Sequence, residues 1–227
     1  MERTRIKICG ITRLKDGAAA AREGADAIGF VFWSGTPRVI APDLARAIRA
    51  ALPPFVSAVG LFVDPEPEAV RAVLAQVPLD VLQFHGSETP ELCRSFGRPY
   101  LKAIPVRAPA GPEALVEYAT RYSDAAGLLF DAPPASGMPG GTGQTFDWDA
   151  LGPHVMSRLP RPLVLSGGLH AGNVAAAIRQ LRPWAVDVSS GVELMDAKGE
   201  IMKGIKDPSR IAAFIAEVRQ ADAGRAA

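Results

Sequence analysis

The chain has 227 residues, 48% of them hydrophobic, and a formal net charge of +1 at pH 7. Its length suits one α/β barrel or two small domains, and its composition allows a large core. A charge so close to zero excludes the strong field expected of a protein that binds nucleic acid or a membrane surface.

The sequence also lacks the signals of several other protein classes. No uncharged apolar run reaches the roughly eighteen residues of a membrane span, and the first residues, MERTRIK, contain no apolar signal core. We therefore expect a cytoplasmic protein. Cys9 and Cys93 lie too far apart in sequence to suggest a disulfide scaffold. The histidines show no ligand-like spacing, so we expect no bound metal.

Apolar runs bounded by turn residues predict eight strands, each followed by a helix. The strands cover residues 5–9, 26–32, 57–63, 79–84, 100–106, 127–131, 163–165 and 185–188. The helices cover residues 12–23, 42–52, 66–76, 90–96, 113–122, a short stretch from about 147, 174–181 and 207–219. Thr12 is a candidate cap of the first helix and Gly24 ends it. Residues 221–227 are expected to form a frayed tail.

The predicted strands are continuous apolar runs, which is typical of a parallel sheet covered by helices on both faces. Eight strand–helix units predict an α/β fold, a single (β/α)8 TIM barrel over residues 1–227. An open doubly wound sheet is the competing architecture. The absence of a Gly-x-Gly-x-x-Gly motif after the first strand favours the closed barrel.

Two turns rich in glycine and serine follow the last two predicted strands. Ser166-Gly167-Gly168 follows the seventh strand, and Ser189-Ser190-Gly191 follows the eighth. Adjacent glycines let backbone N–H groups approach an anion closely. The corresponding loops of a barrel often bind phosphate, so we expect a phosphorylated ligand. Either turn alone could be a simple chain reversal.

Side chains suited to acid–base chemistry stand where other strands end. Cys9 ends the first strand, Asp131 ends the sixth, and Arg38 lies in the loop after the second. A barrel brings these strand ends together, so a ligand could lie between a thiol and a carboxyl group, as proton transfer requires. Each residue also has a plainer interpretation: Cys9 as a buried apolar residue, Asp131 as a loop cap, and Arg38 as a surface charge. Likewise, Asp187 could order a turn, and His85 could bond only to its own loop.

The motifs occur in an order that resembles the phosphoribosylanthranilate isomerase family. The match covers nearly the whole chain, and KICGIT together with VDVSSGVE is a specific pair. Phe84 departs from the family pattern, in which leucine is usual. The matching segments are KICGIT (7–12), GFVF (29–32) with Ser34 and Pro37-Arg38, VGLFV (59–63), LQFHG (82–86), Asp131 with GGTG (140–143) and FDW (146–148), LSGGL (165–169) and VDVSSGVE (186–193).

The resemblance implies a step of tryptophan biosynthesis, the Amadori rearrangement of N-(5-phosphoribosyl)anthranilate, which needs no cofactor. It implies that Cys9 is the general base and Asp131 the general acid. We expect Arg38 to hold the anthranilate carboxylate by a planar two-point fork. The remaining implied ligands of the substrate are Asp187 for a ribose hydroxyl and, for the phosphate, Gly141, Gly143, Gly167, Gly168, Ser189 and Ser190.

Lys7 stands two residues before Cys9, so both side chains share one face of the first strand. The anionic groups of such a substrate would disfavour a thiolate nearby. We therefore expect Lys7 to point into the barrel and to stabilise the Cys9 thiolate. The alternative is that Lys7 pairs with a core carboxylate and does not act on Cys9.

Two other functions stay open at this point. One is the related histidine-pathway isomerase, which opens a similar aminoaldose but in which an aspartate is expected in place of Cys9. The other is a non-catalytic barrel that binds phosphorylated ligands and would need no acid–base pair. We expect a small phosphosugar as the partner, neither nucleic acid nor membrane, and either a monomer or a homodimer.

Overall fold

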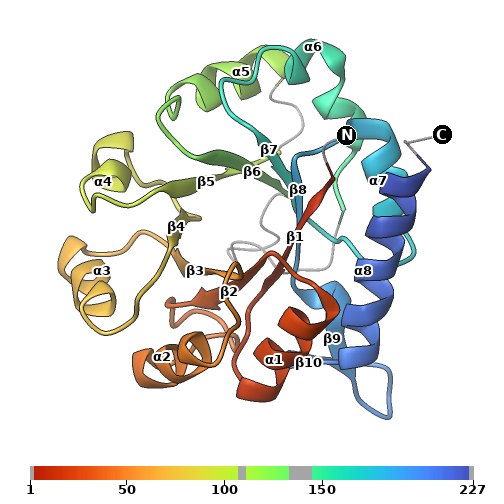
Figure 1. Cartoon of the computed structure of the whole chain (residues 1–227). Coiled ribbons are helices and arrows are strands. Elements are labelled where there is room, and N and C mark those ends of the chain that lie inside the picture. Colours follow the sequence, from red (N-terminus) through yellow and green to blue (C-terminus); the bar gives the residue numbers. More distant parts are fainter. Residues whose placement is uncertain (1–2, 107–110, 133–144, 225–227) are drawn as a thin grey trace.

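A computed structural model of the chain describes residues 3–106, 111–132 and 145–224. Within these residues, eight parallel strands close a barrel in sequence order, with β8 paired to β1. Figure 1 shows the strands at the centre and the helices around them. The predicted single (β/α)8 barrel is thus confirmed and the open sheet is excluded. The strands are β1 (Arg5–Cys9), β2 (Ala27–Val31), β3 (Ser57–Phe62), β4 (Val81–Phe84), β5 (Tyr100–Pro105), β6 (Gly127–Asp131), β7 (Leu163–Leu165) and β8 (Ala185–Val188).

Most of the helices begin at a proline, whose fixed φ suits the first helical turn and whose missing N–H would be unpaired there anyway. Helix α1 ends at Gly24, as predicted, and this glycine has a φ of 99°. The helices are α1 (Leu14–Glu23), α2 (Pro42–Ala50), α3 (Pro67–Leu74), α4 (Pro90–Arg94), α5 (Pro112–Thr120), α6 (Pro153–Met156), α7 (Val174–Leu181) and α8 (Pro208–Ala223), with 3-10 turns η1 (Trp148–Leu151) and η2 (Ser190–Val192).

The core has two parts, because side chains along each strand point alternately outward and inward. Outward side chains such as Ile8, Ile28 and Phe130 pack under the helices in one large apolar cluster. Inward side chains fill the barrel, where Leu129 and Val164 belong to a separate small cluster. The inner layer nearest the C-terminal strand ends is polar instead. It includes Cys9, Gln83, Asp131, Ser166 and Asp187.

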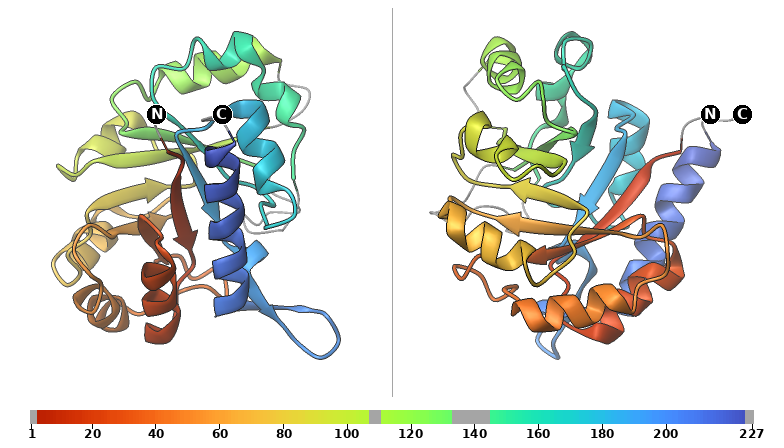
Figure 2. Two further views of the ribbon diagram at one scale, coloured as in Figure 1. Left: turned by 45° about the vertical axis from the view of Figure 1, so that its right-hand side comes forward. Right: turned by 60° about the vertical axis from the view of Figure 1, so that its left-hand side comes forward.

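An antiparallel hairpin that the sequence did not predict follows β8. It consists of β9 (Glu193–Met195) and β10 (Ile201–Lys206), and it projects beyond the ring of helices in Figure 2. The hairpin also explains why the predicted Thr12 cap is wrong. Thr12 Oγ1 donates a hydrogen bond to the Gly204 carbonyl of β10, and α1 begins at Leu14 without a side-chain cap.

The C-terminal helix is longer than the sequence predicted. Helix α8 continues to Ala223, and Ala221 is buried, so the expected fraying from residue 221 is wrong for residues 221–223. The Asp222 carboxylate holds this end against β1 by accepting hydrogen bonds from the backbone and the hydroxyl of Thr4, at 2.7 and 2.8 Å. None of the helices described is both long enough and apolar enough to cross a membrane.

Candidate active site

A pocket lies at the C-terminal ends of the barrel strands, where the predicted site residues were expected to meet. The structure brings together Cys9, Arg38, Asp131, Asp187 and Ser189 in this pocket, from strands far apart in the sequence. Its complete lining is Cys9, Val31, Trp33, Thr36, Arg38, Leu61, Gln83, His85, Asp131, Ser166, Asp187 and Ser189.

Lys7 pairs with an acidic residue inside the barrel and acts through its charge on the Cys9 thiol. Strand β1 pairs with β8 so that Lys7 lies opposite Asp187, and their side chains form a buried ion pair at 2.8 Å. Gly29 on β2 leaves room for the thiol, since a Cβ atom there would lie 2.8 Å from Cys9 Sγ. The two interpretations of Lys7 are therefore both partly right: it pairs with a carboxylate and also interacts with Cys9.

The charges around Cys9 act in opposite directions. Burial raises the pKa of the Cys9 thiol above its ordinary value, and the Asp187 carboxylate adds to this rise. The ammonium groups of Lys7 and Lys206 oppose it without cancelling it. Burial alone would lower the pKa of Lys7, but the charges of Asp187 and Cys9 outweigh that effect and raise it. Lys7 therefore supplies a positive charge beside the thiol.

Asp131 contacts His85, in the loop after β4, and through His85 it is linked to Gln83 of β4. His85 Nε2 lies 3.1 Å from Asp131 Oδ2, and the other carboxylate oxygen accepts a hydrogen bond from the Ala132 N–H at 2.8 Å. His85 Nδ1 lies 3.1 Å from the side-chain amide of Gln83. The interpretation of His85 as bonded only to its own loop is wrong, because its Nε2 atom lies at hydrogen-bond distance from Asp131 on β6.

The Arg38 guanidinium holds a carboxylate of the protein itself along one of its edges, and its predicted fork to the substrate carboxylate stays a prediction. Its Nε and Nη2 donate to the two carboxylate oxygens of Glu193, at 2.8 and 2.7 Å, and both side chains are buried. Burial alone would raise the pKa of Glu193, but the hydrogen bonds from Arg38 and the charge of Lys206 lower it overall. The sequence could not show this contact because Glu193 lies in the unpredicted hairpin.

One wall of the pocket is apolar. Val31 and Leu61 form a small cluster with Cys9, and Trp33 packs against it. Trp33 stands two residues after β2 and was missed in the sequence analysis. Because this wall lines the same pocket as the Cys9 thiol and Arg38, it offers an apolar surface to a flat ring of the ligand.

The two predicted phosphate turns lie side by side. A Cβ atom at Gly191 would lie 2.0 Å from the Leu169 carbonyl oxygen, so the turns after β7 and β8 are in contact. Gly167 and Gly168 have φ values of 87° and 60°, and within the described chain their N–H groups donate no backbone hydrogen bond. Ser190 is buried beside them. Gly141 and Gly143 lie outside the described residues.

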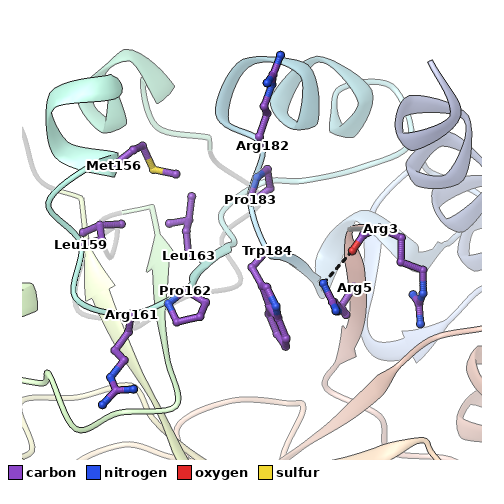
Figure 3. Close-up of a pocket in the computed structure, with 10 residues that line it drawn as sticks. All are labelled: Arg3, Arg5, Met156, Leu159, Arg161, Pro162, Leu163, Arg182, Pro183 and Trp184. Carbon is purple, nitrogen blue, oxygen red and sulfur yellow. Dashed lines mark hydrogen bonds between the residues drawn. The ribbon is translucent and has the colours of Figure 1, made fainter. Parts of the chain in front are cut away.

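A second cavity, of about 270 Å³, lies at the opposite end of the barrel (Figure 3). Arg3, Arg5, Arg161 and Arg182 surround it, together with Trp184, over which the Arg5 guanidinium stacks at 4.7 Å. In Figure 3 the side chains of Arg161 and Arg182 extend away from each other. These two side chains therefore do not converge on one point, as the polar side chains of the first pocket do.

Comparison with known proteins gives one consistent family. A family model described as N-(5'phosphoribosyl)anthranilate (PRA) isomerase matches residues 6–217. The chain is 53% identical to an N-(5'-phosphoribosyl)anthranilate isomerase of Alcanivorax borkumensis over 95% of each chain. It is 42% identical to the solved phosphoribosyl anthranilate isomerase of Thermotoga maritima, with a TM-score of 0.82 over 96% of this chain and 99% of the other.

A further solved relative matches as well. It is a phosphoribosyl anthranilate isomerase in complex with reduced 1-(o-carboxyphenylamino)-1-deoxyribulose 5-phosphate, with 41% identity and a TM-score of 0.80 over 96% of this chain and 99% of the other. The family match extends from β1 into α8, and thus includes every strand of the barrel. The chain belongs to the N-(5'-phosphoribosyl)anthranilate isomerase family.

Proposed function

We propose that this protein converts N-(5'-phosphoribosyl)anthranilate to 1-(2-carboxyphenylamino)-1-deoxyribulose 5-phosphate. The observation that carries the proposal is a single pocket that holds the Cys9 thiol, the Asp131 carboxyl group, an apolar wall and Arg38. The solved relative that holds the reduced aminoketose phosphate supports this substrate chemistry. The reaction moves protons within one molecule and so requires an acid and a base on the same ligand.

Ring opening would begin at Asp131. Its protonated carboxyl group gives a proton to the ribose ring oxygen, the bond from C1 to that oxygen breaks, and the nitrogen lone pair forms an iminium ion. This positive charge acidifies the hydrogen on C2. The Ala132 N–H and His85 fix the direction of the carboxyl group, because each contacts a different oxygen.

Proton removal would fall to Cys9. Its thiolate takes the C2 hydrogen, and the resulting enolamine tautomerises to the ketone. Lys7 holds positive charge beside the thiol, which favours the thiolate against the effect of burial. Cys9 ends β1 and Asp131 ends β6, so the acid and the base reach the ligand from different walls of the pocket.

The rest of the pocket would position the substrate. The phosphate meets Gly167, Gly168, Ser189 and Ser190, and we keep Gly141 and Gly143 as proposed ligands of the same group. The anthranilate ring lies on the wall of Val31, Trp33 and Leu61, with its carboxylate drawn to Arg38. Glu193 holds the Nε–Nη2 edge of the guanidinium and so fixes the direction in which Arg38 faces the pocket. Asp187 contacts the ribose while it stays paired with Lys7.

A fluorescence assay tests the reaction and both assignments. Phosphoribosylanthranilate is generated in place from anthranilate and phosphoribosyl pyrophosphate by the upstream transferase, and its decay is followed after this protein is added. We expect rapid decay, with a loss of at least about 10²-fold in kcat for Cys9→Ala and for Asp131→Asn. Both variants should still bind the reduced product.

Two results would contradict the proposal. Full activity in either variant would refute the role of that residue. Decay at the spontaneous rate in the wild type, with phosphosugar still bound, would favour the non-catalytic barrel. Turnover of the histidine-pathway aminoaldose alone would favour the related isomerase.

We further propose that the chain forms a homodimer. One relative from Thermotoga maritima is described as dimeric, with 40% identity over 96% of this chain. Phe55, just before β3, is fully exposed and has a φ of 71°, an unusual conformation for a bulky side chain. It lies at the same end of the barrel as the second cavity, because both adjoin the N-terminal ends of strands.

A further inference from the structure

Gln83 is a fully buried amide with an unsatisfied polar atom beside the proposed acid. Its side chain is completely covered, one end of the amide contacts His85 Nδ1, and Oε1 has no hydrogen-bond partner in the described part of the chain. A buried polar atom without a partner costs about 1–3 kcal/mol, so a leucine of similar volume would fit this position better. An amide at this buried position therefore calls for a reason beyond packing.

Gln83, His85 and Asp131 form a continuous line of polar atoms. The amide meets Nδ1 of the imidazole at 3.1 Å, and Nε2 meets the carboxylate at 3.1 Å. Each nitrogen of an imidazole can either donate or accept. When Asp131 is ionised, Nε2–H donates to its carboxylate and Nδ1 accepts from the Gln83 N–H. When His85 takes up a second proton, Nδ1 also carries a hydrogen. Nδ1–H must then donate, and it needs an oxygen opposite it.

A carboxamide can meet both demands. Its oxygen and nitrogen ends have nearly the same shape, so a half turn of the Gln83 amide replaces a donor with an acceptor at Nδ1. Glutamate could only accept, and leucine could do neither. The end that faces away from His85 is unpartnered in the orientation described, which is the cost of keeping both ends available.

We propose that His85 supplies the proton that Asp131 gives to the substrate, and that Gln83 is the positioning residue that accommodates both protonation states of His85. The inference rests on the proposed function, because it assumes that Asp131 acts as the acid. An imidazole can both take up and give a proton, and its Nε2 already lies at hydrogen-bond distance from the carboxyl group. The line of atoms gives the acid a proton source inside the pocket.

The protons balance over one turnover. The Nε2 proton of a His85 imidazolium moves to Asp131 Oδ2 and leaves a neutral imidazole that carries its proton on Nδ1. Asp131 Oδ2–H then passes that proton to the ring oxygen as the C1–oxygen bond breaks. Cys9 takes one proton from C2, so the enzyme as a whole is unchanged, and exchange with water at the pocket returns that proton to His85. The His85 side chain is 11% exposed, which permits this exchange.

Other charged groups surround this line within the described residues. Cys9 from β1, Arg38 after β2 and Asp187 from β8 face the same pocket. Below the loop that carries His85, Glu88 pairs with Lys102 at 2.8 Å, and Asp64 accepts from the Ser87 N–H at 2.6 Å. These contacts hold the loop from beneath. They leave Gln83 and Asp131 as the polar partners of the imidazole for which hydrogen bonds are observed.

Three variants distinguish a role of His85 in supplying protons from a role in holding Asp131 in place. His85→Gln keeps a hydrogen-bond donor near Asp131 but has no exchangeable acid, and we expect kcat to fall about 10²-fold. Gln83→Leu removes the amide and should lower kcat about tenfold. KM should stay within about twofold in both, because neither residue is proposed to hold the substrate. His154→Gln, on the exposed helix α6, is the matched control and should retain full activity.

Chemical rescue gives a result that a purely structural role would not give. In His85→Ala, added imidazole should restore kcat, whereas pyrazole, which has the same size but is far less basic, should not. Equal rescue by both compounds, or full activity of His85→Gln, would overturn the inference. Failure of the proposed function looks different: the wild type would be inactive, or Asp131→Asn would keep its activity. Circular dichroism confirms that each variant folds.

Discussion

Burial disfavours the thiolate form of Cys9, and the neighbouring ammonium groups, Lys7 more than Lys206, favour it. Lys7 projects from the same face of β1, and its charge is shared with Asp187 at 2.8 Å. The pKa of Cys9 is raised overall by burial, so the fraction present as thiolate increases with pH. The rate of any step that uses this thiolate should increase in the same direction.

Replacing Lys7 with methionine tests this balance. Without the ammonium group, burial and the unpaired Asp187 carboxylate act together, so the pKa of Cys9 should rise further. We expect kcat/KM at pH 7 to fall about tenfold or more, with recovery at higher pH. Ultraviolet titration of the thiolate measures the effect directly. An unchanged Cys9 titration would refute the interaction, and Asp187→Asn should change the Cys9 pKa in the opposite direction.

At the scale of elements, the β9–β10 hairpin supports the wall of the pocket that Arg38 forms. Glu193 of β9 binds the guanidinium, and Lys206 of β10 donates to Glu193 at 3.2 Å. Gly204 has a φ of 83°, and a Cβ atom there would lie 3.0 Å from the Pro37 carbonyl oxygen. The hairpin therefore packs directly against the segment that carries Arg38.

Gly204→Ala should loosen that contact. The new methyl group would push β10 away from Pro37. We therefore expect KM to rise severalfold while kcat changes less, because the role proposed for Arg38 is in binding. Gly199→Ala is a matched control. Gly199 has a similar φ of 80° but has no atom within 4 Å of its added Cβ, so it should share the backbone strain without the change in KM. Equal effects of both variants on KM would count against a role for the hairpin in binding.

At the scale of the whole molecule, the two ends of the barrel differ in what they expose. The C-terminal end carries the pocket that Cys9 and Asp131 line. The N-terminal end carries the cavity beside Trp184 and, on the loop before β3, the fully exposed Phe55. Association through the N-terminal end would cover an exposed aromatic ring and leave the pocket open.

Phe55→Glu should therefore produce monomers. The wild type is expected to elute with twice the chain mass of 23.9 kDa in size-exclusion chromatography with light scattering, and the variant with the single mass. Catalytic activity should be retained, because Phe55 is remote from the pocket lining. Met202→Glu, on the exposed hairpin, should leave the wild-type mass unchanged. A monomeric wild type would exclude the proposed dimer.

The sequence by itself determined the barrel and the places where its strands end. Continuous apolar runs and regular turns specify β1 to β8 locally, and strand order then places Cys9, Asp131 and Asp187 at one end. The predicted helix ends were also close to the observed ones, because prolines and Gly24 fix the backbone conformation of their own segments.

The tertiary structure alone decided which polar side chains are partners. Arg38 with Glu193 and His85 with Asp131 join segments 155 and 46 residues apart, and no local pattern encodes such distances. The hairpin escaped prediction because β9 has only three residues, and much of β10 is exposed. Thr12 likewise bonds to Gly204 instead of capping its own helix. Long-range contacts override local preference wherever a distant polar group is brought within reach.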